Sequence, residues 1–388
     1  MGVHRAAIVG AGHTRFGVLE EGPRALLRAA VAGAFASVDR APERSSVDEM
    51  FLATLGFGGW QIGNSASVLA EESGGVGVPV TRVENACASG GFALRAAVRA
   101  VSSGSAELVL VAGVEKMTDV SNARRRYWLG VSGDTEWERL AGLTFAGVYG
   151  LIASRYLSEH RLGREALAEV AVKNHEAGAL NPNAHFRKAI RTDQVLGAPR
   201  VADPLGLYDC CPVSDGAAAI LVARADVARR FTDTPVWVDG LGAGSDYLAV
   251  QERPDLVRFA ATRRAADAAF ASAGFDRSKV SFALVHDCFT IAELLALEDL
   301  GFAAPGEAPR LTLARETRRT GRLPVNPDGG LKAKGHPIGA TGVSQAYEVF
   351  AQLRGQAGAR QVPGASHALT HNVGGAGATA AVTVFSVG

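Results

Sequence analysis

Short apolar runs alternate with amphipathic stretches over the first third of the chain. Residues 22–40 carry an Ala/Leu stripe at helical spacing behind Pro23, and they follow the apolar run of residues 5–11. Apolar residues at every third or fourth position predict a helix, whereas a short, fully apolar run predicts a strand covered on both faces. The pattern predicts further strands over residues 47–57, 78–85 and 107–116, and further helices over residues 64–74 and 88–104. This alternation is typical of an α/β fold.

The pattern changes between residues 119 and 208, where aromatic and charged residues interrupt the apolar runs, and core-like sequence returns at residues 214–227. We interpret the intervening segment as an inserted domain that carries a binding surface. Its basic residues are either solvated charge or contacts to a phosphate group. These residues are Arg124, Arg125, Arg126, Arg187, Lys188 and Arg191.

A second copy of the first pattern begins at Pro235. Residues 236–246 resemble residues 6–14 in their apolar run and glycine-rich exit, and residues 335–355 take the place that residues 85–104 hold in the first copy. A repeated order of elements indicates duplicated units. We therefore expect two pseudo-duplicated halves, each supplying one helix N-terminus to a shared central site. The predicted domains are residues 1–118 with 209–232, the inserted residues 119–208, and residues 233–388.

Charge and composition exclude several classes of function. Lys and Arg number 40 against 39 Asp and Glu, so a net charge of +1 gives no overall field that attracts nucleic acid or an anionic membrane. The four cysteines lie far apart except for one adjacent pair, which indicates a reduced protein without a disulfide framework. The ends show no targeting signal, and no apolar run reaches the roughly 18 residues of a membrane helix. We expect a cytoplasmic protein without a membrane span.

Cys87 lies immediately before the small-residue helix predicted over residues 88–104. The positive end of a helix dipole and its unpaired N–H groups stabilise a thiolate and an adjacent oxyanion. Cys87 is therefore either a covalent nucleophile or a buried core cysteine. His336 stands between Gly335 and Pro337 before the equivalent helix of the second copy, where it is either a turn residue or a base that faces Cys87.

The sequence VHDCFT at residues 285–290 places titratable groups at the end of an apolar run, residues 278–285, that predicts a buried strand. The two-residue period of a strand puts His286 and Cys288 on one side and Asp287 on the other. The pair either faces a cavity or is structural. A metal site of His286, Cys288, Cys87 and His336 lacks CxxC or HxxxH spacing, so we predict no metal.

Residues 369–377 read LTHNVGGAG, an apolar strand that opens into glycines after Asn372. Glycines allow a backbone N–H to approach a ligand closely, so this segment is either an oxyanion donor or a close-packed hairpin. The chain has no GxGxxG sequence after a strand, which argues against a dinucleotide-binding fold.

Four motifs together resemble the thiolase superfamily, in particular thiolases of the sterol carrier protein 2 type. They are NACASGG, HDCF, KGHPIGATG and HNVGG, and they occur in family order with DCCPVSDGAAA between the first two. Most thiolases carry Asn where this chain has His286, and a second cysteine where it has Asn372. The sterol carrier type resembles this chain at both places. The resemblance implies a five-layered αβαβα fold.

The resemblance also implies a reaction. Cys87 would attack a 3-oxoacyl-CoA while His336 takes its proton, and Cys288 would protonate the enolate that leaves. A second CoA would then take the acyl group, or the reverse Claisen condensation would run. His336 with a water held by His286 would form one oxyanion hole, and the N–H groups of Cys87 and Gly374 the other.

Further implications concern ligands and partners. Cys211 would line the pantetheine groove, the inserted domain would cover CoA, and CoA would be a co-substrate with no permanently bound cofactor. A homodimer or homotetramer is expected. Three alternatives stay open: a retro-aldol lyase acting on steroid side chain CoA esters with a small partner protein, a C-acyltransferase of natural product assembly, and a non-catalytic lipid-binding subunit. Retention of two cysteines and two histidines at the matched places argues against the last.

Overall fold

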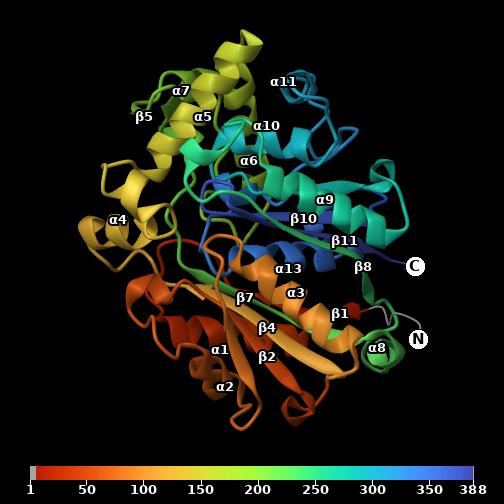
Figure 1. The fold of residues 1–388 in the computed structure, drawn as a ribbon. Helices are drawn as coiled ribbons and strands as arrows, with labels where there is room; N and C mark the ends of the chain where they lie inside the picture. Colours follow the sequence, from red (N-terminus) through yellow and green to blue (C-terminus); the bar gives the residue numbers. More distant parts are fainter. Residues whose placement is uncertain (1–5, 388) are drawn as a thin grey trace.

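The computed structural model describes residues 6–387 and forms a mixed α/β architecture (Figure 1). Residues 1–5 and 388 lie outside the described residues, and they belong to the chain ends for which no targeting signal is predicted. The strands are β1 Ala6–His13, β2 Glu49–Ala53, β3 Val80–Val83, β4 Leu108–Glu115, β5 Arg200–Ala202, β6 Leu205–Gly206, β7 Gly216–Arg224, β8 Val236–Ser245, β9 Phe282–Leu284, β10 His367–Gly374 and β11 Thr379–Ser386. The helices are α1 Pro23–Ala36, α2 Ala66–Ser73, α3 Ser89–Ser102, α4 Asn122–Gly130, α5 Phe145–His160, α6 Glu165–Ala179, α7 Thr192–Leu196, α8 Ala225–Phe231, α9 Ala260–Ala273, α10 Thr290–Asp299, α11 Ala308–Leu313, α12 Gly330–Ala333 and α13 Thr341–Leu353.

The strand order repeats between the two halves. The first half runs β3-β2-β4-β7-β1 and the second runs β8-β11-β10-β9, with the halves joined where Ala6–Ile8 of β1 pairs with Val236–Val238 of β8. In the first half β2 pairs with β4 in parallel, and in the second half β9 pairs with β10 in parallel. The returning strand of each half, β7 or β11, is antiparallel to its neighbour β4 or β10. Val325 bridges Ala283 of β9 in parallel, in the place that β3 holds in the first half. This shared order confirms the predicted duplication.

Helices and sheet form five layers. Helices α3 and α13 lie between the two halves of the sheet and share one apolar core with both (Figure 1). Helices α1 and α2 cover the outer face of the first half, and α9 and α10 cover that of the second. The predicted αβαβα fold is therefore confirmed. Among residues 6–387, no helix combines the length and the apolar character that crossing a bilayer requires.

Glycines let helices pack closely on the first strand of each half. A Cβ at Gly12 of β1 would lie 2.1 Å from the carbonyl oxygen of Ala30 in α1. A Cβ at Gly242 of β8 would lie 1.8 Å from the carbonyl oxygen of Ala265 in α9. The same close approach in both halves explains the glycine-rich exits that the sequence repeats.

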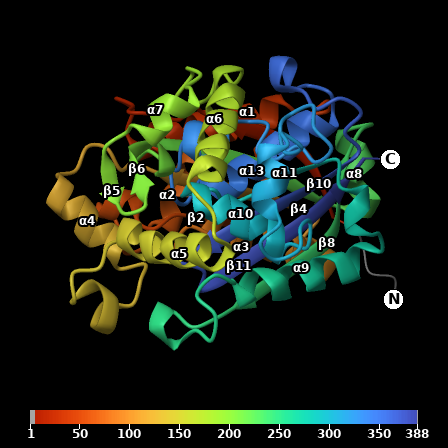
Figure 2. The same ribbon diagram turned by 90° about the horizontal axis from the view of Figure 1, so that it is seen from above.

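The segment between β4 and β7 contains α4 to α7 and the short β5–β6 ribbon. Its helices α5 and α6 lie beside α10 and α11 of the second half (Figures 1 and 2), and Tyr149 and Tyr156 of α5 enter the apolar core of that half. The inserted segment thus covers the second half and reaches the centre of the molecule. The three domain boundaries given above stay a prediction.

Candidate active site

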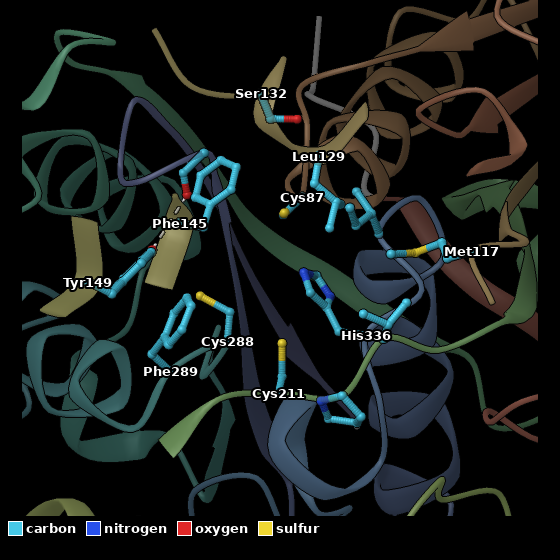
Figure 3. Close-up of a pocket in the computed structure, with 14 residues that line it drawn as sticks. Cys87, Met117, Leu129, Ser132, Phe145, Tyr149, Cys211, Cys288, Phe289 and His336 are labelled. Carbon is cyan, nitrogen blue, oxygen red and sulfur yellow. Dashed lines mark hydrogen bonds between the residues drawn. The ribbon is translucent and has the colours of Figure 1, made fainter. Parts of the chain in front are cut away.

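A cavity of about 170 Å³ lies where the two halves and the inserted segment meet. Figure 3 shows the sulfur atoms of Cys87, Cys211 and Cys288 and the ring of His336 around one space. The remaining lining is mostly apolar and includes Met117, Leu129, Ser132, Phe145, Tyr149, Pro212, Val213, Phe289, Ile338 and Gly375. Such a cavity with a few convergent reactive groups is the usual setting of an active site.

Cys87 is held in a tight turn before α3. Ala86 has a φ of 49°, and the Ser89 hydroxyl accepts the N–H of Asn85 at 2.9 Å while donating to the Ala86 carbonyl at 2.6 Å. Burial raises the pKa of Cys87 to about 12, with smaller effects of Cys211 and the acidic side chains nearby. A hydrogen bond from the backbone N–H of Gly375 acts in the opposite direction on this pKa. Cys87 therefore rests as a protonated thiol.

His336 is oriented by the first residue of α13, Thr341. Its Nδ1 lies 2.7 Å from the Thr341 hydroxyl, which donates its own proton to the Pro337 carbonyl at 3.0 Å. Because the Thr341 hydroxyl proton is already donated to Pro337, the hydroxyl oxygen accepts a hydrogen bond from Nδ1–H of His336. Nε2 of His336 therefore carries the free lone pair. Nε2 has no hydrogen-bond partner among the described residues. Burial, with Lys334 nearby, lowers the pKa of His336 to about 3, so the ring is a neutral proton acceptor.

His286 completes a cluster with the two predicted partners. Its ring centroid lies 5.1 Å from that of His336, with the rings at 82°. The Cys87 sulfur and one nitrogen of each ring all lie within 4.8 Å of one another. Neither nitrogen of His286 has a hydrogen-bond partner among residues 6–387, and burial holds its pKa well below the usual value. The tertiary fold thus assembles a cluster that no local spacing indicated.

Cys288 faces the same cavity from the second half. Burial raises its pKa above the ordinary thiol value, with Cys87 the next largest cause, and a hydrogen bond with the Tyr149 hydroxyl acts against this rise. Tyr149 stacks on Phe289 at 4.5 Å between ring centroids. A neutral thiol at this place can deliver a proton to the cavity and take it back.

Asp287 points away from Cys288, as the alternation predicted. Its carboxylate accepts the N–H of Leu331 at 2.7 Å and the amide of Asn174 at 2.7 Å. The strand itself is shorter than predicted, since β9 covers Phe282–Leu284 and a 3-10 turn precedes it. Asp287 thus fastens the loop that carries His286 and Cys288 to the segment before His336.

Cys211 and Gly374, both predicted to contribute to the site, lie close to Cys288 and Cys87. The Cys211 N–H donates to the Cys288 carbonyl at 3.0 Å, and Cys211 lines the cavity. Gly374 packs against the turn of Cys87, since a Cβ there would lie 2.6 Å from the Asn85 carbonyl oxygen. Gly375, which the sequence did not single out, lines the cavity. The roles predicted for these residues stay predictions.

Glu115 is a further residue that sequence reasoning missed. It ends the apolar strand β4 and is fully buried, and its carboxylate accepts the N–H groups of Leu55 at 2.9 Å and Gly339 at 3.0 Å. Burial raises the pKa of Glu115 to about 7. The sequence signal that could have identified Glu115 is a charged residue at the end of an apolar strand. In the structure Glu115 fixes the loop after His336.

The basic residues of the insertion do not converge on the cavity. The guanidinium of Arg124 lies over the Trp60 ring at 4.3 Å from its centroid, and Arg191 pairs with Asp193 at 3.0 Å. Arg125, Arg126, Arg187 and Lys188 do not line the cavity. Whether any of these residues meets a phosphate stays a prediction.

Comparisons with known proteins agree with this arrangement. Residues 6–226 match the thiolase N-terminal domain model, and residues 242–387 match the thiolase C-terminal domain-like model. An acetyl-CoA acetyltransferase of Methanothermobacter thermautotrophicus is 45% identical over 98% of this chain and 99% of its own length. Human sterol carrier protein 2 is 32% identical over 92% of this chain and 67% of its own length. The chain belongs to the thiolase family.

Solved structures carry the same fold. An Ltp2-ChsH2(DUF35) aldolase has a TM-score of 0.85 at 26% identity, covering 98% of this chain and 97% of that chain. Acetyl-CoA acetyltransferase of Syntrophomonas wolfei has a TM-score of 0.73 at 17% identity, covering 99% of both chains, and supports the fold alone. The family models and the acetyl-CoA acetyltransferase relative identify the chain as a CoA-dependent acyltransferase. An aldolase is among the solved structures with the same fold.

Proposed function

We propose that the protein cleaves a 3-oxoacyl-CoA with CoA, or runs the reverse Claisen condensation, through an acyl-Cys87 intermediate. The observation that carries this proposal is the cluster of the Cys87 sulfur with nitrogens of His286 and His336, all within 4.8 Å of one another, beside the cavity that Cys288 also lines. A nucleophile, a base and a second acid/base within one cavity are what C–C thiolysis needs.

The first step joins the Cys87 sulfur to the 3-oxo carbon while Nε2 of His336 accepts the thiol proton. Because burial raises the pKa of Cys87 and lowers that of His336, no ion pair forms beforehand, and the proton moves as the S–C bond forms. Collapse of the adduct breaks the bond between C2 and C3, and its electron pair becomes an enolate. Cys288 protonates C2, which releases acetyl-CoA and leaves the acyl group on Cys87.

The second step returns the acyl group to CoA. The Cys288 thiolate takes the proton of the incoming CoA thiol, the new S–C bond forms, and Cys87 leaves and recovers its proton. The oxyanions of both steps would be held by His336 with a water on His286, and by the N–H groups of Cys87 and Gly374. Two observations support this: both ring nitrogens of His286 lack partners among the described residues, and Gly374 packs against the turn of Cys87, where an added Cβ would lie 2.6 Å from the Asn85 carbonyl oxygen.

The proposal also covers the co-substrate, the cellular setting and the partners of the protein. CoA serves as a co-substrate with no permanently bound cofactor, and Cys211 lines the groove of its pantetheine arm. The protein works in lipid metabolism in the cytoplasm as a homodimer or homotetramer. A small partner protein also belongs to the proposal, because the aldolase among the structural relatives is a pair, Ltp2 with ChsH2(DUF35).

The test replaces Cys87 by Ala and follows CoA-dependent loss of acetoacetyl-CoA. Removing the nucleophile should lower turnover by on the order of 10⁴-fold or more. Cys210→Ala is the matched control, since Cys210 adjoins Cys211 but does not line the cavity. Turnover by Cys87→Ala equal to that of the control would refute the acyl-enzyme route. Retro-aldol activity retained by Cys87→Ala would instead favour the lyase alternative.

Cys288 has a separate test. Cys288→Ala should still form an acyl adduct on Cys87 from a reactive acyl-CoA, seen as a mass increment, but should fail to make the C–C bond. Full synthetic activity in this variant would remove Cys288 from the acid/base role.

A further inference from the structure

We propose that Cys87, His286 and His336 bind a zinc(II) ion in the resting protein and that this ion blocks the first catalytic step. Thiolate and imidazole are the ligand set that zinc prefers, and three protein ligands leave a fourth position open. The proposal departs from the prediction of no metal that the sequence spacing gave, because the fold brings together three ligands from separate motifs. Here the metal is a reversible competitor of the substrate and not a resident cofactor.

The spacing of the three ligand atoms fits such an ion after a small adjustment. The atoms lie within 4.8 Å of one another, which puts the centre of their triangle at most about 2.8 Å from each. Zinc bonds are about 2.0 to 2.1 Å to nitrogen and about 2.3 Å to sulfur, so the sulfur needs to move inward by at most about 0.5 Å and each nitrogen by at most about 0.8 Å. Side-chain rotation supplies shifts of this size without moving the backbone.

The ring nitrogens are available as donors. His286 is 1% exposed and His336 is 6% exposed, yet both nitrogens of His286 and Nε2 of His336 lack hydrogen-bond partners among residues 6–387. Buried polar atoms without partners are uncommon and call for an explanation. His336 also has the support that metal-binding histidines usually have, because its Nδ1–H donates to Thr341 at 2.7 Å.

The binding step balances as a proton exchange. Zinc(II) displaces the thiol proton of Cys87 to solvent, and the sulfur and two imidazole lone pairs become its ligands. The ion then occupies both the nucleophile and the lone pair of the base. Zinc binding depends only on the cluster of Cys87, His286 and His336, whereas inhibition of thiolysis by zinc rests on the proposed function. Experiments can therefore refute the zinc site and the proposed function separately.

The binding test uses the full chain with zinc chloride, in a buffer without thiols, and measures alkylation of Cys87 by iodoacetamide with mass spectrometry. One equivalent of zinc should slow Cys87 alkylation at least about tenfold, and EDTA should restore it. His286→Asn should weaken zinc binding at least about tenfold, whereas Cys210→Ala should leave it unchanged. Unslowed alkylation, or His286→Asn binding zinc as tightly as the wild type, would overturn the proposal.

Cobalt(II) gives a second readout that does not depend on the histidine variant folding. Bound cobalt should show a thiolate charge-transfer absorption in the wild-type chain and lose it in Cys87→Ser. Absence of that absorption at saturating cobalt would also overturn the proposal. If zinc protects Cys87 but thiolysis was never detectable in the metal-free protein, the proposed function fails while the zinc site stands.

Discussion

The crossing of the two central helices offers a sensitive test of how the site is positioned. Gly342 in α13 meets Gly90 and Gly91 in α3, and a Cβ at position 342 would lie 2.3 Å from the Gly91 nitrogen and 2.4 Å from Oδ1 of Asn372. Ordinary van der Waals contact of a Cβ atom begins at 3.4 Å, so the Cβ and the Gly91 nitrogen would have to move about 1.1 Å further apart. Gly342→Ala should therefore push the helices apart by about 1 Å.

The expected effects on rate and stability differ in size. Cys87 precedes α3 and His336 precedes α13, so the separation changes the distance between Cys87 and His336, the proposed nucleophile and base. A misplacement of about 1 Å costs on the order of 100-fold in rate. Overpacking should lower the free energy of unfolding by about 1 to 3 kcal/mol, offset by up to about 1 kcal/mol because Ala favours helix over Gly.

The assay compares kcat for acetoacetyl-CoA thiolysis and the urea unfolding midpoint of Gly342→Ala with those of Gly63→Ala. A Cβ at Gly63 would meet nothing within 4 Å, so this control should match the wild type in both measurements. Unchanged kcat in a stably folded Gly342→Ala would show that the helix crossing does not set the distance between Cys87 and His336.

Two further predictions concern protons at the site. Thr341→Val should lower kcat about 10-fold to 100-fold, because His336 loses the acceptor that fixes its Nδ1 proton. Thr341→Ser keeps that acceptor and should retain most of the wild-type kcat. Equal rates for the two variants would contradict this tautomer assignment. Burial puts the pKa of Cys87 at about 12 and that of His336 at about 3, so both stay neutral near pH 7. Iodoacetamide should therefore alkylate Cys87 about tenfold faster for each pH unit from about pH 6 to pH 9, and a plateau below about pH 8 would reveal a preformed thiolate.

The repeating pattern of strands and helices predicted the fold because apolar runs and small-residue helices carry it locally. Strand ends were less predictable: β2 ends at Ala53 because the chain bends through Gly56, whose φ is 107°, and β9 is shortened by the turn before it. The hydrophobic pattern alone does not mark these ends: the turn before β9 is closed by local hydrogen bonds, such as the Ser278 N–H to the Asp276 carboxylate at 2.8 Å, and the apolar residues of both segments continue past the strands.

The residues of the site also differ in how far the sequence alone could predict them. Cys87 and His336 carried local signals, because each precedes a helix rich in small residues. Tyr149 carried none, since it lies on an ordinary helix of the insertion and acquires a role only where the fold brings it to Cys288. Thr341 was hidden for another reason: its importance lies in one hydrogen bond to a ring nitrogen.

Helix α13 has a consequence for how the gene can be divided. Of its 13 residues, Tyr347 is the one that is not fully buried, and the helix packs against strands of both halves. A chain cut between α8 and β8, at residues 232–235, would leave either fragment with an uncovered apolar surface. We expect each fragment to aggregate when produced alone and the two to regain one cooperative unfolding transition when refolded together.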